Sequence, residues 1–333
     1  HWLNHWADST PDKVFLHQPV DREIQTHTWA QIKTKVESIA ASLHHLGLNR
    51  GDKVAILSKN CAEWLIADLA IMRAGMISIP IYPSANAETV QYVLEHSEAK
   101  AAFIGKLDKW QTAEPGVKGN VIRIAMNYET MPCQYQWQQL DNLGAPIAEY
   151  LPQLDDLMSI IYTSGSTGNP KGAMISYRAY AWANDRIVNI LSFSDSDRFL
   201  SYLPLAHITE RCLVEGAAYH CNMTLYFTES LEHFVADLNF AKPTVFFSVP
   251  RLWSLFQKNI IDKIGLRKLN FLLATPIIKG LISKKIRTGL GLEHARINAS
   301  GSAPISPAII RWYQKIGINI CEAWGMTENC IYA

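Results

Sequence analysis

The sequence predicts an α/β fold of two lobes, with mostly parallel sheets flanked by helices. Short apolar runs rich in β-branched residues alternate along the chain with segments of helical periodicity. Strands separated by helices of this length pair in parallel, and the helices then cover both faces of the sheet. The 333 residues also exceed the length, about 250–300 residues, at which one hydrophobic core stops growing, so two lobes are expected.

The elements follow one another in a regular order. Helical periodicity is clear at 29–46, and a turn at 49–52 leads into an apolar strand. The expected elements after that turn are strand 54–57, helix 61–74, strand 77–81, helix 87–97, and strands 101–104, 121–125 and 159–162. A second set of strands is expected at 198–202, 223–227, 245–248, 296–300 and 319–322. Residues 106–157 are polar and rich in glutamine, which favours a long surface connection.

Composition excludes several classes of protein. The net charge of +1 and the 18% of charged residues do not give the chain the positive electrostatic potential that would attract DNA or RNA. Six cysteines form neither a C-x-x-C pair nor a zinc-type cluster, which favours a reducing compartment without a structural metal. The longest apolar stretch, 64–82, is interrupted by Asp68 and Arg73, and no signal peptide is visible. We therefore expect a cytoplasmic location.

Residues 162–172 carry the most informative local pattern, a phosphate-binding loop. Hydroxyl side chains and three glycines surround Lys171, directly after an apolar strand. Glycines let backbone N–H groups face an anion, hydroxyls add donors and the lysine adds positive charge. The loop is not a Walker A motif, because Pro170 stands where the glycine before the lysine is required. The alternative is an ordinary Ser/Gly loop.

This loop resembles the signature of the AMP-forming adenylating enzymes, which include acyl-CoA synthetases, luciferases and the adenylation domains of peptide synthetases. Three later segments resemble motifs of the same family in the same order: Ser201–Glu210, Ser300–Pro307 and Glu322–Glu328. Segments 6–15 and 28–32 are similar to the entry segments of fatty acyl-CoA synthetases. The resemblance covers nearly the whole chain.

The resemblance implies two α/β lobes with the active site between them. By motif, one lobe would hold residues 54–190 with the phosphate loop. The other would hold residues 1–53 plus 195–333, with the adenine, magnesium and acyl contacts. The small C-terminal domain of the family would lie beyond Ala333, together with its catalytic lysine and ribose-binding aspartate.

The resemblance also implies roles for individual residues. The loop would hold the β- and γ-phosphates of ATP, Lys171 would steady it, Thr327 would bond the α-phosphate and Glu328 would hold Mg²⁺. The residues expected to contact the nucleotide are Thr163, Ser164, Gly165, Ser166, Thr167, Gly168, Gly301, Ser302, Ala303, Pro304, Glu322, Ala323, Trp324, Gly325, Met326 and Thr327. Trp324 replaces the usual tyrosine of the family; its indole can still stack on adenine, but the tyrosine hydroxyl is lost. The alternatives are an ordinary turn at 300–304 and a solvated glutamate at a helix start.

The second motif indicates the substrate. The family places a histidine near the acyl carboxylate, a role for His207, although a lone histidine among apolar residues is often a core residue. Members that activate amino acids keep an aspartate here to pair with the α-ammonium group, whereas Glu210 is the only acid in this segment. Together with likeness to long-chain synthetases at 210–213 and 245–251, this favours a fatty acid. The expected co-substrates are ATP and CoA. Chain length and oligomeric state stay open.

Residues 258–287 form a basic amphipathic segment, with eight Lys or Arg residues, one acid and many interleaved apolar side chains. A solvated helical face is one interpretation, and peripheral contact with an anionic membrane is the other.

The leading hypothesis is a long-chain fatty acid–CoA ligase core, an enzyme that makes acyl-AMP and then the CoA thioester. Two alternatives stay open: a fatty acyl-AMP ligase serving a carrier protein, and a non-catalytic module that senses nucleotide or acyl groups.

Overall fold

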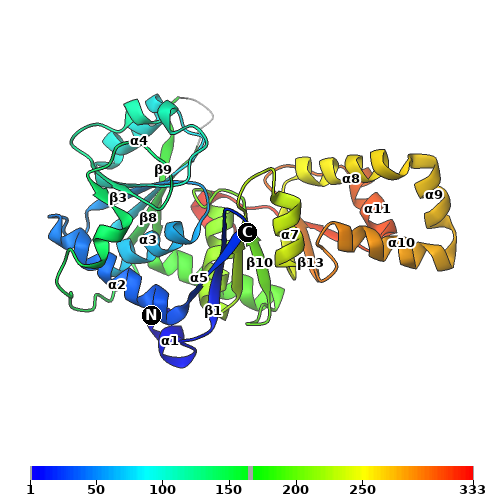
Figure 1. Ribbon diagram of the computed structural model, residues 1–333, viewed down its shortest axis with the longest axis horizontal. Helices are drawn as coiled ribbons and strands as arrows, with labels where there is room; N and C mark the ends of the chain where they lie inside the picture. Colours follow the sequence, from blue (N-terminus) through cyan, green and yellow to red (C-terminus); the bar gives the residue numbers. More distant parts are fainter. Residues whose placement is uncertain (1, 164–167, 333) are drawn as a thin grey trace.

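The largest sheet has seven strands and lies in the upper left of Figure 1. The computed structural model describes residues 2–163 and 168–332. In spatial order the strands are β7 (Tyr135–Gln136), β6 (Ile122–Ala125), β5 (Ala99–Ile104), β3 (Lys53–Leu57), β4 (Ile77–Ile81), β8 (Leu157–Thr163) and β9 (Lys171–Ser176). Neighbours pair in parallel except β9, which runs antiparallel to β8. Helices α3 (Ala62–Arg73) and α4 (Ala87–Ser97) connect its strands, and Asn86 caps α4 by accepting from the Thr89 N–H.

Two smaller sheets form the rest of the strand framework. One has the order β10 (Arg198–Ser201), β11 (Thr224–Phe227), β1 (Val14–Val20) and β2 (Glu23–Thr28), with β2 antiparallel to β1. The other has the order β12 (Val245–Ser248), β13 (Ile297–Ser300) and β14 (Ile320–Glu322), all parallel. The two sheets meet where the Thr244 N–H donates to the Arg198 carbonyl at 3.1 Å.

Helices cover these sheets. They are α1 (Trp2–Ser9), α2 (Trp29–His45), α5 (Tyr177–Leu191), the π-helical segment η4 (Glu210–Gly216), α6 (Ala217–Cys221), α7 (Phe234–Ala241) and α11 (Pro307–Lys315). A capping box at Thr28 begins α2, because the Thr28 hydroxyl and the Gln31 side chain each accept from the other's backbone N–H.

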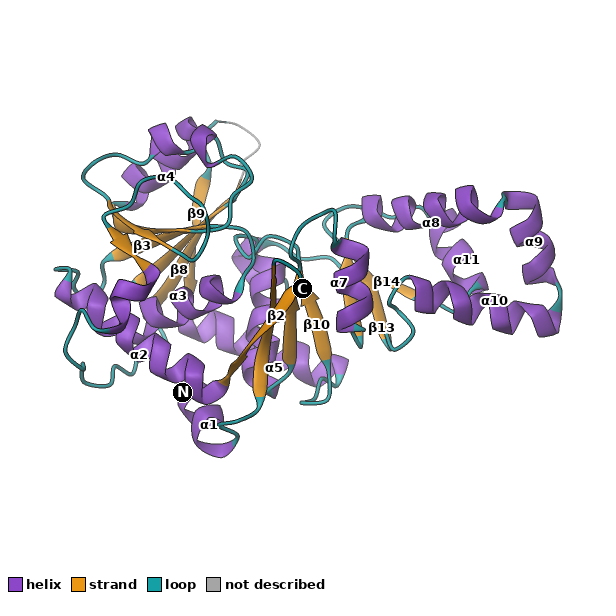
Figure 2. Ribbon diagram, viewed as in Figure 1, coloured by secondary structure: helices purple, strands orange, loops and turns teal. Residues whose placement is uncertain are grey.

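Three helices project from the body and form an arm at the right of Figures 1 and 2: α8 (Pro250–Ile264), α9 (Leu266–Ala274) and α10 (Pro276–Gly289). Gly265 ends α8 with a φ of 87°, a conformation that glycine adopts without strain. Pro276 starts α10 at a position where its missing N–H costs nothing. The arm contains the basic amphipathic segment 258–287.

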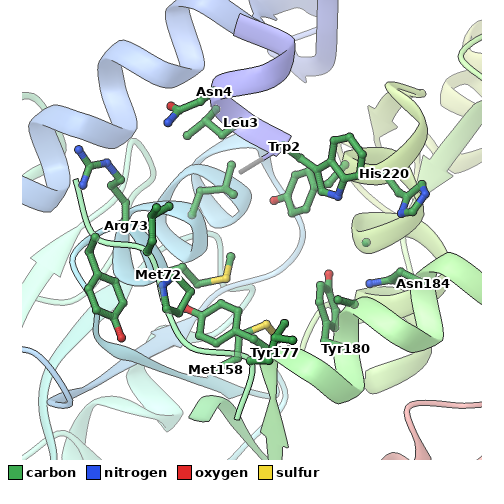
Figure 3. Close-up of a pocket in the computed structure, with 18 of the residues that line it drawn as sticks. Trp2, Leu3, Asn4, Met72, Arg73, Met158, Tyr177, Tyr180, Asn184 and His220 are labelled. Carbon is green, nitrogen blue, oxygen red and sulfur yellow. The ribbon is translucent and has the colours of Figure 1, made fainter. Parts of the chain in front are cut away.

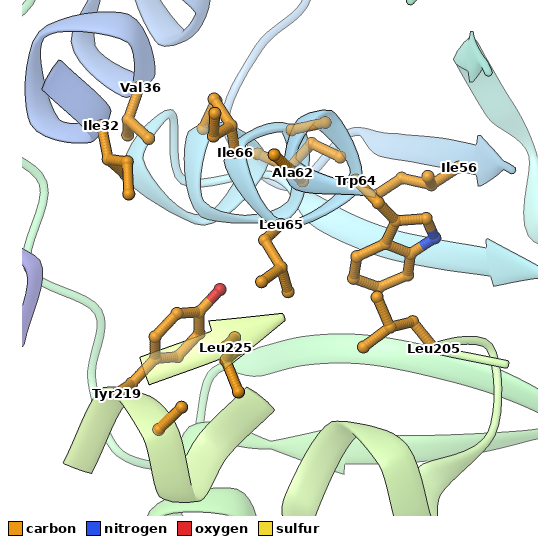
Figure 4. Packing of buried hydrophobic residues seen from close by; sticks show 14 of the residues in the cluster. Ile32, Val36, Ile56, Ala62, Trp64, Leu65, Ile66, Leu205, Tyr219 and Leu225 are labelled. Carbon is orange, nitrogen blue, oxygen red and sulfur yellow. The ribbon is translucent and has the colours of Figure 1, made fainter. Parts of the chain in front are cut away.

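One hydrophobic core joins the seven-stranded sheet to the β1-containing sheet. Trp64 and Leu65 of α3 belong to the same buried cluster as Leu205, Tyr219 and Leu225 from the other side (Figure 4). The two halves therefore share an apolar interface.

The fold class is confirmed: the structure is α/β with mostly parallel sheets flanked by helices. Four strands were not anticipated: β1, β2, β7 and β9, of which β2 and β9 run antiparallel to a neighbour. The segment 106–157 is also more than a connection, because β6 and β7 within it extend the large sheet.

The lobe division at 54–190 stays a prediction. The strands of the large sheet run from Lys53, within a few residues of the predicted start of that lobe, to Ser176. Helix α2 packs on α3 of the large-sheet half, and α5 packs on η4 and α6 of the other half, so both helices contact elements across the predicted division.

Candidate functional site

A cavity of about 610 Å³ lies where the carboxyl ends of β4 and β8 face residues from the second half of the chain. Pro80–Tyr82 and Tyr162–Thr163 line one side, and His207, Ile208 and 325–328 line the other. Because β4 and β8 are parallel neighbours, their carboxyl ends meet at one edge, where ligands of α/β folds gather.

The phosphate loop begins at this cavity. Thr163 ends β8 and lines the cavity, as does Pro170. Ser164, Gly165, Ser166 and Thr167 lie outside the described residues. Gly168 is exposed with a φ of 92°, which a side chain would make strained. Lys171 pairs with Thr163 in the antiparallel register and is exposed rather than part of the cavity lining.

His207 presents a hydrogen-bond donor at the cavity. The Thr209 backbone N–H donates to its Nδ1 at 3.1 Å, so the proton of the neutral ring is on Nε2. Burial lowers the pKa of His207 below its usual value of 6.5, which favours the neutral ring near pH 7. A neutral ring with a proton on Nε2 can donate to a carboxylate or phosphate oxygen.

Asn60 holds the segment that carries His207. Its Nδ2 donates to Ser201 Oγ at 2.8 Å and to the Leu203 carbonyl at 2.6 Å, and its Oδ1 accepts from the Leu205 N–H at 3.0 Å. Glu210 accepts from Ser201 Oγ and from the Tyr202 N–H, and burial raises its pKa to about 8. The acid of this motif is thus a buried support group near His207. The sequence pattern did not indicate Asn60, because it lies far from its partners along the chain; Ser201, for example, is 141 residues away.

The Thr-Glu motif reaches the cavity through a tight loop. Gly325 leaves no room for a side chain, since a Cβ there would lie 2.5 Å from Ile331 Cα. Thr327 is buried at the start of the short helix η5 (Thr327–Asn329), and Glu328 is exposed. Gly325, Met326, Thr327 and Glu328 all line the cavity.

The segment expected to contact adenine lies beside this loop. Gly301 packs between Phe247 and Ala323, where a Cβ would meet Phe247 at 2.7 Å and the Ala323 carbonyl at 3.0 Å. The adjoining residues of both segments are exposed: Ser302, Ala303, Pro304, Glu322 and Trp324. None of these residues, nor Gly301 or Ala323, lines the cavity within the described part of the chain. The structure thus brings segments 301–304 and 322–324 together at one sheet edge, next to the cavity.

Sequence reasoning missed the wall formed by the strand β4 end and α4. Pro80, Ile81, Tyr82 and Thr89 line the cavity, as does Tyr162. The Tyr162 hydroxyl lies 2.8 Å from His96 Nδ1, and burial raises its pKa to about 12. A usable signal was present, because a strand ending in Pro-Ile-Tyr-Pro next to the phosphate-loop strand places those residues at the ligand edge.

A buried ion cluster lies between α3 and η4. Arg211 of η4 forms a bidentate pair with Asp68 of α3, at 3.0 and 2.9 Å, and approaches Glu215 at 3.5 Å. All three side chains are inaccessible to solvent. Burial raises the pKa of Glu215 to about 8, although Arg211 lowers it. The pair ties η4 to α3 across the shared core.

Metal ligands are sparse. The described residues contain no group of three or more His, Cys, Asp or Glu side chains that could enclose a metal. An ion held by Glu328 would therefore take phosphate oxygens and water as its other ligands, which is the usual pattern for Mg²⁺.

Comparison with known families decides the relationship. The model of the family described as "AMP-binding enzyme" matches residues 3–333. The chain belongs to this AMP-binding family. Curated relatives include "Long-chain-fatty-acid--CoA ligase ACSBG2" of Rattus norvegicus, 29% identical over 91% of this chain and 52% of that protein. "Long-chain-fatty-acid--CoA ligase FadD15" of Mycobacterium bovis is 28% identical over 96% of this chain and 58% of that protein.

Solved structures with this fold include the A-PCP didomain of carboxylic acid reductase from Segniliparus rugosus in complex with AMP. It has a TM-score of 0.82 at 19% identity and covers 98% of this chain and 51% of that one. The o-succinylbenzoate coenzyme A synthetase of Bacillus subtilis in complex with AMP has a TM-score of 0.75 at 21% identity, over 99% of this chain and 59% of that one. The chain spans about half the length of the curated relatives that it matches. No helix among the described residues has both the length and the apolarity needed to cross a bilayer.

Proposed function

We propose that this chain is the adenylating core of a long-chain fatty acid–CoA ligase. It would activate a fatty acid to acyl-AMP with release of pyrophosphate, and the acyl group would then pass to CoA as a thioester. One observation carries the proposal: Thr163, His207, Thr327 and Glu328, separated by up to 165 positions in the numbering, line one cavity between the halves of the molecule.

The residues can perform adenylation chiefly by positioning and charge. A carboxylate oxygen attacks the α-phosphorus, forming the acyl–phosphate bond as the bond to pyrophosphate breaks. No general base is needed, because a carboxylate is already ionised near pH 7. The Nε2–H of His207 would orient the carboxylate, and the Thr327 hydroxyl would donate to the α-phosphate.

The loop at 163–168 and Glu328 would manage the leaving group. Thr163 and Gly168 flank the loop, and we propose that it holds the β- and γ-phosphates. Glu328 would hold Mg²⁺ at the rim of the cavity, and the ion, when bound, would neutralise charge on the phosphates. Lys171, exposed on β9 opposite Thr163, would steady the loop.

Adenine would stack near the edge formed by segments 301–304 and 322–324. The exposed Trp324 offers a flat apolar face there, 69% accessible to solvent. Close packing of Gly301 against Ala323 keeps both segments adjacent.

Two observations support the fatty-acid assignment: the His207 segment offers no available acidic side chain, and the relatives are named as long-chain fatty acid ligases. Glu210 is buried, with its pKa raised to about 8, and accepts hydrogen bonds from Ser201 and Tyr202, so it is not available to pair with an α-ammonium group. A carrier protein as acyl acceptor is the first alternative, and a sensing module without turnover is the second.

The test is ATP–pyrophosphate exchange with carboxylates of graded length, in the protein that carries this chain. Each CH₂ buried in an apolar site contributes about 0.8 kcal/mol, or roughly fourfold in affinity, so kcat/KM should rise by orders of magnitude from acetate to dodecanoate or hexadecanoate. Amino acids should stay near background. If acetate or a free amino acid is the best substrate, the fatty-acid assignment is wrong, and absence of exchange with every carboxylate would favour the sensing module. Adding CoA or an acyl carrier protein then identifies the acceptor.

We also propose that the arm formed by α8–α10 contacts an anionic membrane. Apolar side chains at its outer part face solvent, with Phe271 70%, Ile277 91% and Leu281 70% exposed. Two basic residues of the arm pair with acids, Lys258 with Asp262 and Lys284 with Glu293. Lys263, Arg267, Lys268, Lys279 and Lys285 form no ion pair within the described part of the chain. Exposed apolar residues flanked by unpaired cations are typical of a helix that lies in a bilayer interface.

A further inference from the structure

A second cavity, of about 500 Å³, lies between α3 and α5 (Figure 3). We call it the α3–α5 cavity. Its walls come from the end of α3, from α5, from segment 149–154 and from residues 216–220, with α1 at its edge. Among the described residues, none lines both this cavity and the one that holds His207.

The walls of the α3–α5 cavity are largely apolar. Leu69 and Met72 come from α3, Met158 comes from β8, and the aromatic rings of Tyr177 and Tyr180 come from α5. A volume of this size with apolar and aromatic walls is within the range of small-molecule sites. This cavity therefore suits a ligand with an apolar chain or ring rather than a compact ion.

Three buried polar atoms in these lining residues have no hydrogen-bond partner in the described structure: Arg73 Nε, Tyr177 Oη and Asn184 Oδ1. Asn184 is only 3% exposed, and its amide points toward the cavity in Figure 3. An unpaired buried polar group costs about 1–3 kcal/mol, so a ligand oxygen that accepts from Arg73 Nε and Tyr177 Oη would recover that energy, whereas Asn184 Oδ1 is an acceptor and needs a donor. Arg73 and Tyr177 are donors, which selects an acceptor oxygen in the ligand head.

The head is most simply a carboxylate. Arg73 forms no ion pair within the described residues, and its Nη1 donates only to the Ala148 carbonyl, at 3.1 Å. The lining carboxylate, Glu149, is exposed and accepts from Asn4 at 2.6 Å. An apolar chain with one carboxylate therefore fits both the walls and the cation.

The cavity is coupled to the His207 segment through hydrogen bonds. Tyr180, in the cavity wall, donates from its hydroxyl to the Arg211 carbonyl at 3.0 Å. Arg211 pairs with Asp68, the neighbour of Leu69 on α3. Helices α3 and α5, which form the two walls, are thus both hydrogen-bonded to η4. Segment η4 begins three positions after His207. The buried Asp68–Arg211 pair joins α3 to η4, so an alkyl chain passing between these two elements would have to displace charges.

We propose that the α3–α5 cavity is a second ligand site, which binds a free fatty acid as an effector and changes turnover at the His207 cavity without competing for it. The proposal rests on the proposed function for its choice of fatty acid. It adds a regulatory site at a place that the adenylation chemistry does not use.

The first test is photo-labelling without ATP, using dodecanoate that carries a diazirine on its chain, followed by peptide mapping. We expect labels on α3 (Ala62–Arg73) and α5 (Tyr177–Leu191) in the unmodified protein. Ala181→Trp, which adds bulk at an exposed cavity-lining position, should reduce this labelling at least tenfold. Ala179→Trp is the matched control, because Ala179 is exposed on the same helix but outside the lining. Labels restricted to 80–82 and 207–208 would overturn the proposal.

The second test is kinetic. In the unmodified protein and in Ala179→Trp, the rate should depend on dodecanoate concentration non-hyperbolically, and Ala181→Trp should make the dependence hyperbolic. If the cavity is instead the far end of the substrate site, Ala181→Trp will raise KM for hexadecanoate and leave octanoate unchanged, which contradicts an effector site. Labelling does not require turnover, so a protein without exchange activity that still labels at α3 and α5 would refute the proposed function alone.

Discussion

At the scale of single residues, the structure separates groups that face the candidate nucleotide cavity from groups that support them. His207, Thr327 and Glu328 line the cavity, whereas Asn60 and Glu210 hold the His207 segment from behind. The position of His207 in an apolar sequence was compatible with a core residue. The structure gives its ring a defined tautomer at a cavity wall, and its role toward substrate stays a proposal.

Glu328→Gln should lower ATP–pyrophosphate exchange at least tenfold, or about 1.4 kcal/mol, because the amide keeps the shape but loses the charge that we propose binds Mg²⁺. The loss of exchange activity in Glu328→Gln should be largest at limiting Mg²⁺. Glu232→Gln is the control, since Glu232 is an exposed carboxylate outside the cavity lining. Equal exchange by Glu328→Gln and the unmodified protein at limiting Mg²⁺ would rule out this role.

At the scale of elements, local sequence predicted most helices and strands of the first half to within a few residues. Strand β4 and helix α4 were predicted with the bounds that the structure shows, 77–81 and 87–97. Antiparallel β9 was missed because its first two residues, Lys171 and Gly172, were assigned to the glycine-rich loop, and the remainder, 173–176, was not assigned to a strand. Its pairing with β8 depends on the chain reversing across that loop, which periodicity does not reveal.

The arm α8–α10 can be tested as a membrane-binding element. Replacing Phe271 and Ile277 together with serine should weaken binding to phosphatidylglycerol-containing vesicles by at least tenfold, since each loses apolar burial worth about 1.5–3 kcal/mol. Binding should also fall as salt rises, because the lysines act through long-range charge. Leu231→Ser provides the control, as Leu231 is 86% exposed and lies outside the arm. If this control weakens binding as much as the double variant does, or if neutral phosphatidylcholine vesicles bind equally well, the arm is a solvated face.

At the scale of the whole molecule, the two halves are joined by an apolar core and by buried polar groups that cross it. Asn60 follows strand β3 of the large sheet, and it bonds Ser201 and Leu203 of the other half. Glu210 completes this network. The cavity therefore depends on the alignment of both halves.

We expect Glu210 to make the stability of the folded protein depend on pH. Its pKa is raised to about 8 by burial, from an unperturbed value near 4.5. Between these values the folded protein holds a proton that the unfolded chain has lost, so stability falls as pH rises through this range. The pKa of Glu215 is also raised to about 8, so Glu215 adds a similar decrease of stability with rising pH.

Glu210→Gln should therefore lose less stability than the unmodified protein between pH 6 and pH 9, by at least about 1 kcal/mol, since one pKa unit equals about 1.4 kcal/mol. Thermal unfolding across this pH range measures the difference between the two proteins, and it includes any change in the pKa of Glu215, whose charge acts on Glu210. Parallel stability curves would show that Glu210 does not titrate in this range.

The sequence by itself determined the fold class, most elements of the large sheet and the order of the four motifs, because these depend on local periodicity and on residue types at fixed spacing. Only the tertiary structure decided which motif residues share a cavity. Thr163 and Thr327 reach it, whereas Gly301 and Trp324 lie at the neighbouring sheet edge. Tertiary structure also showed the walls at Pro80–Tyr82, the supporting Asn60 and the α3–α5 cavity. These features arise from side chains far apart in the chain that meet only after the sheets have packed, so no local pattern encodes them.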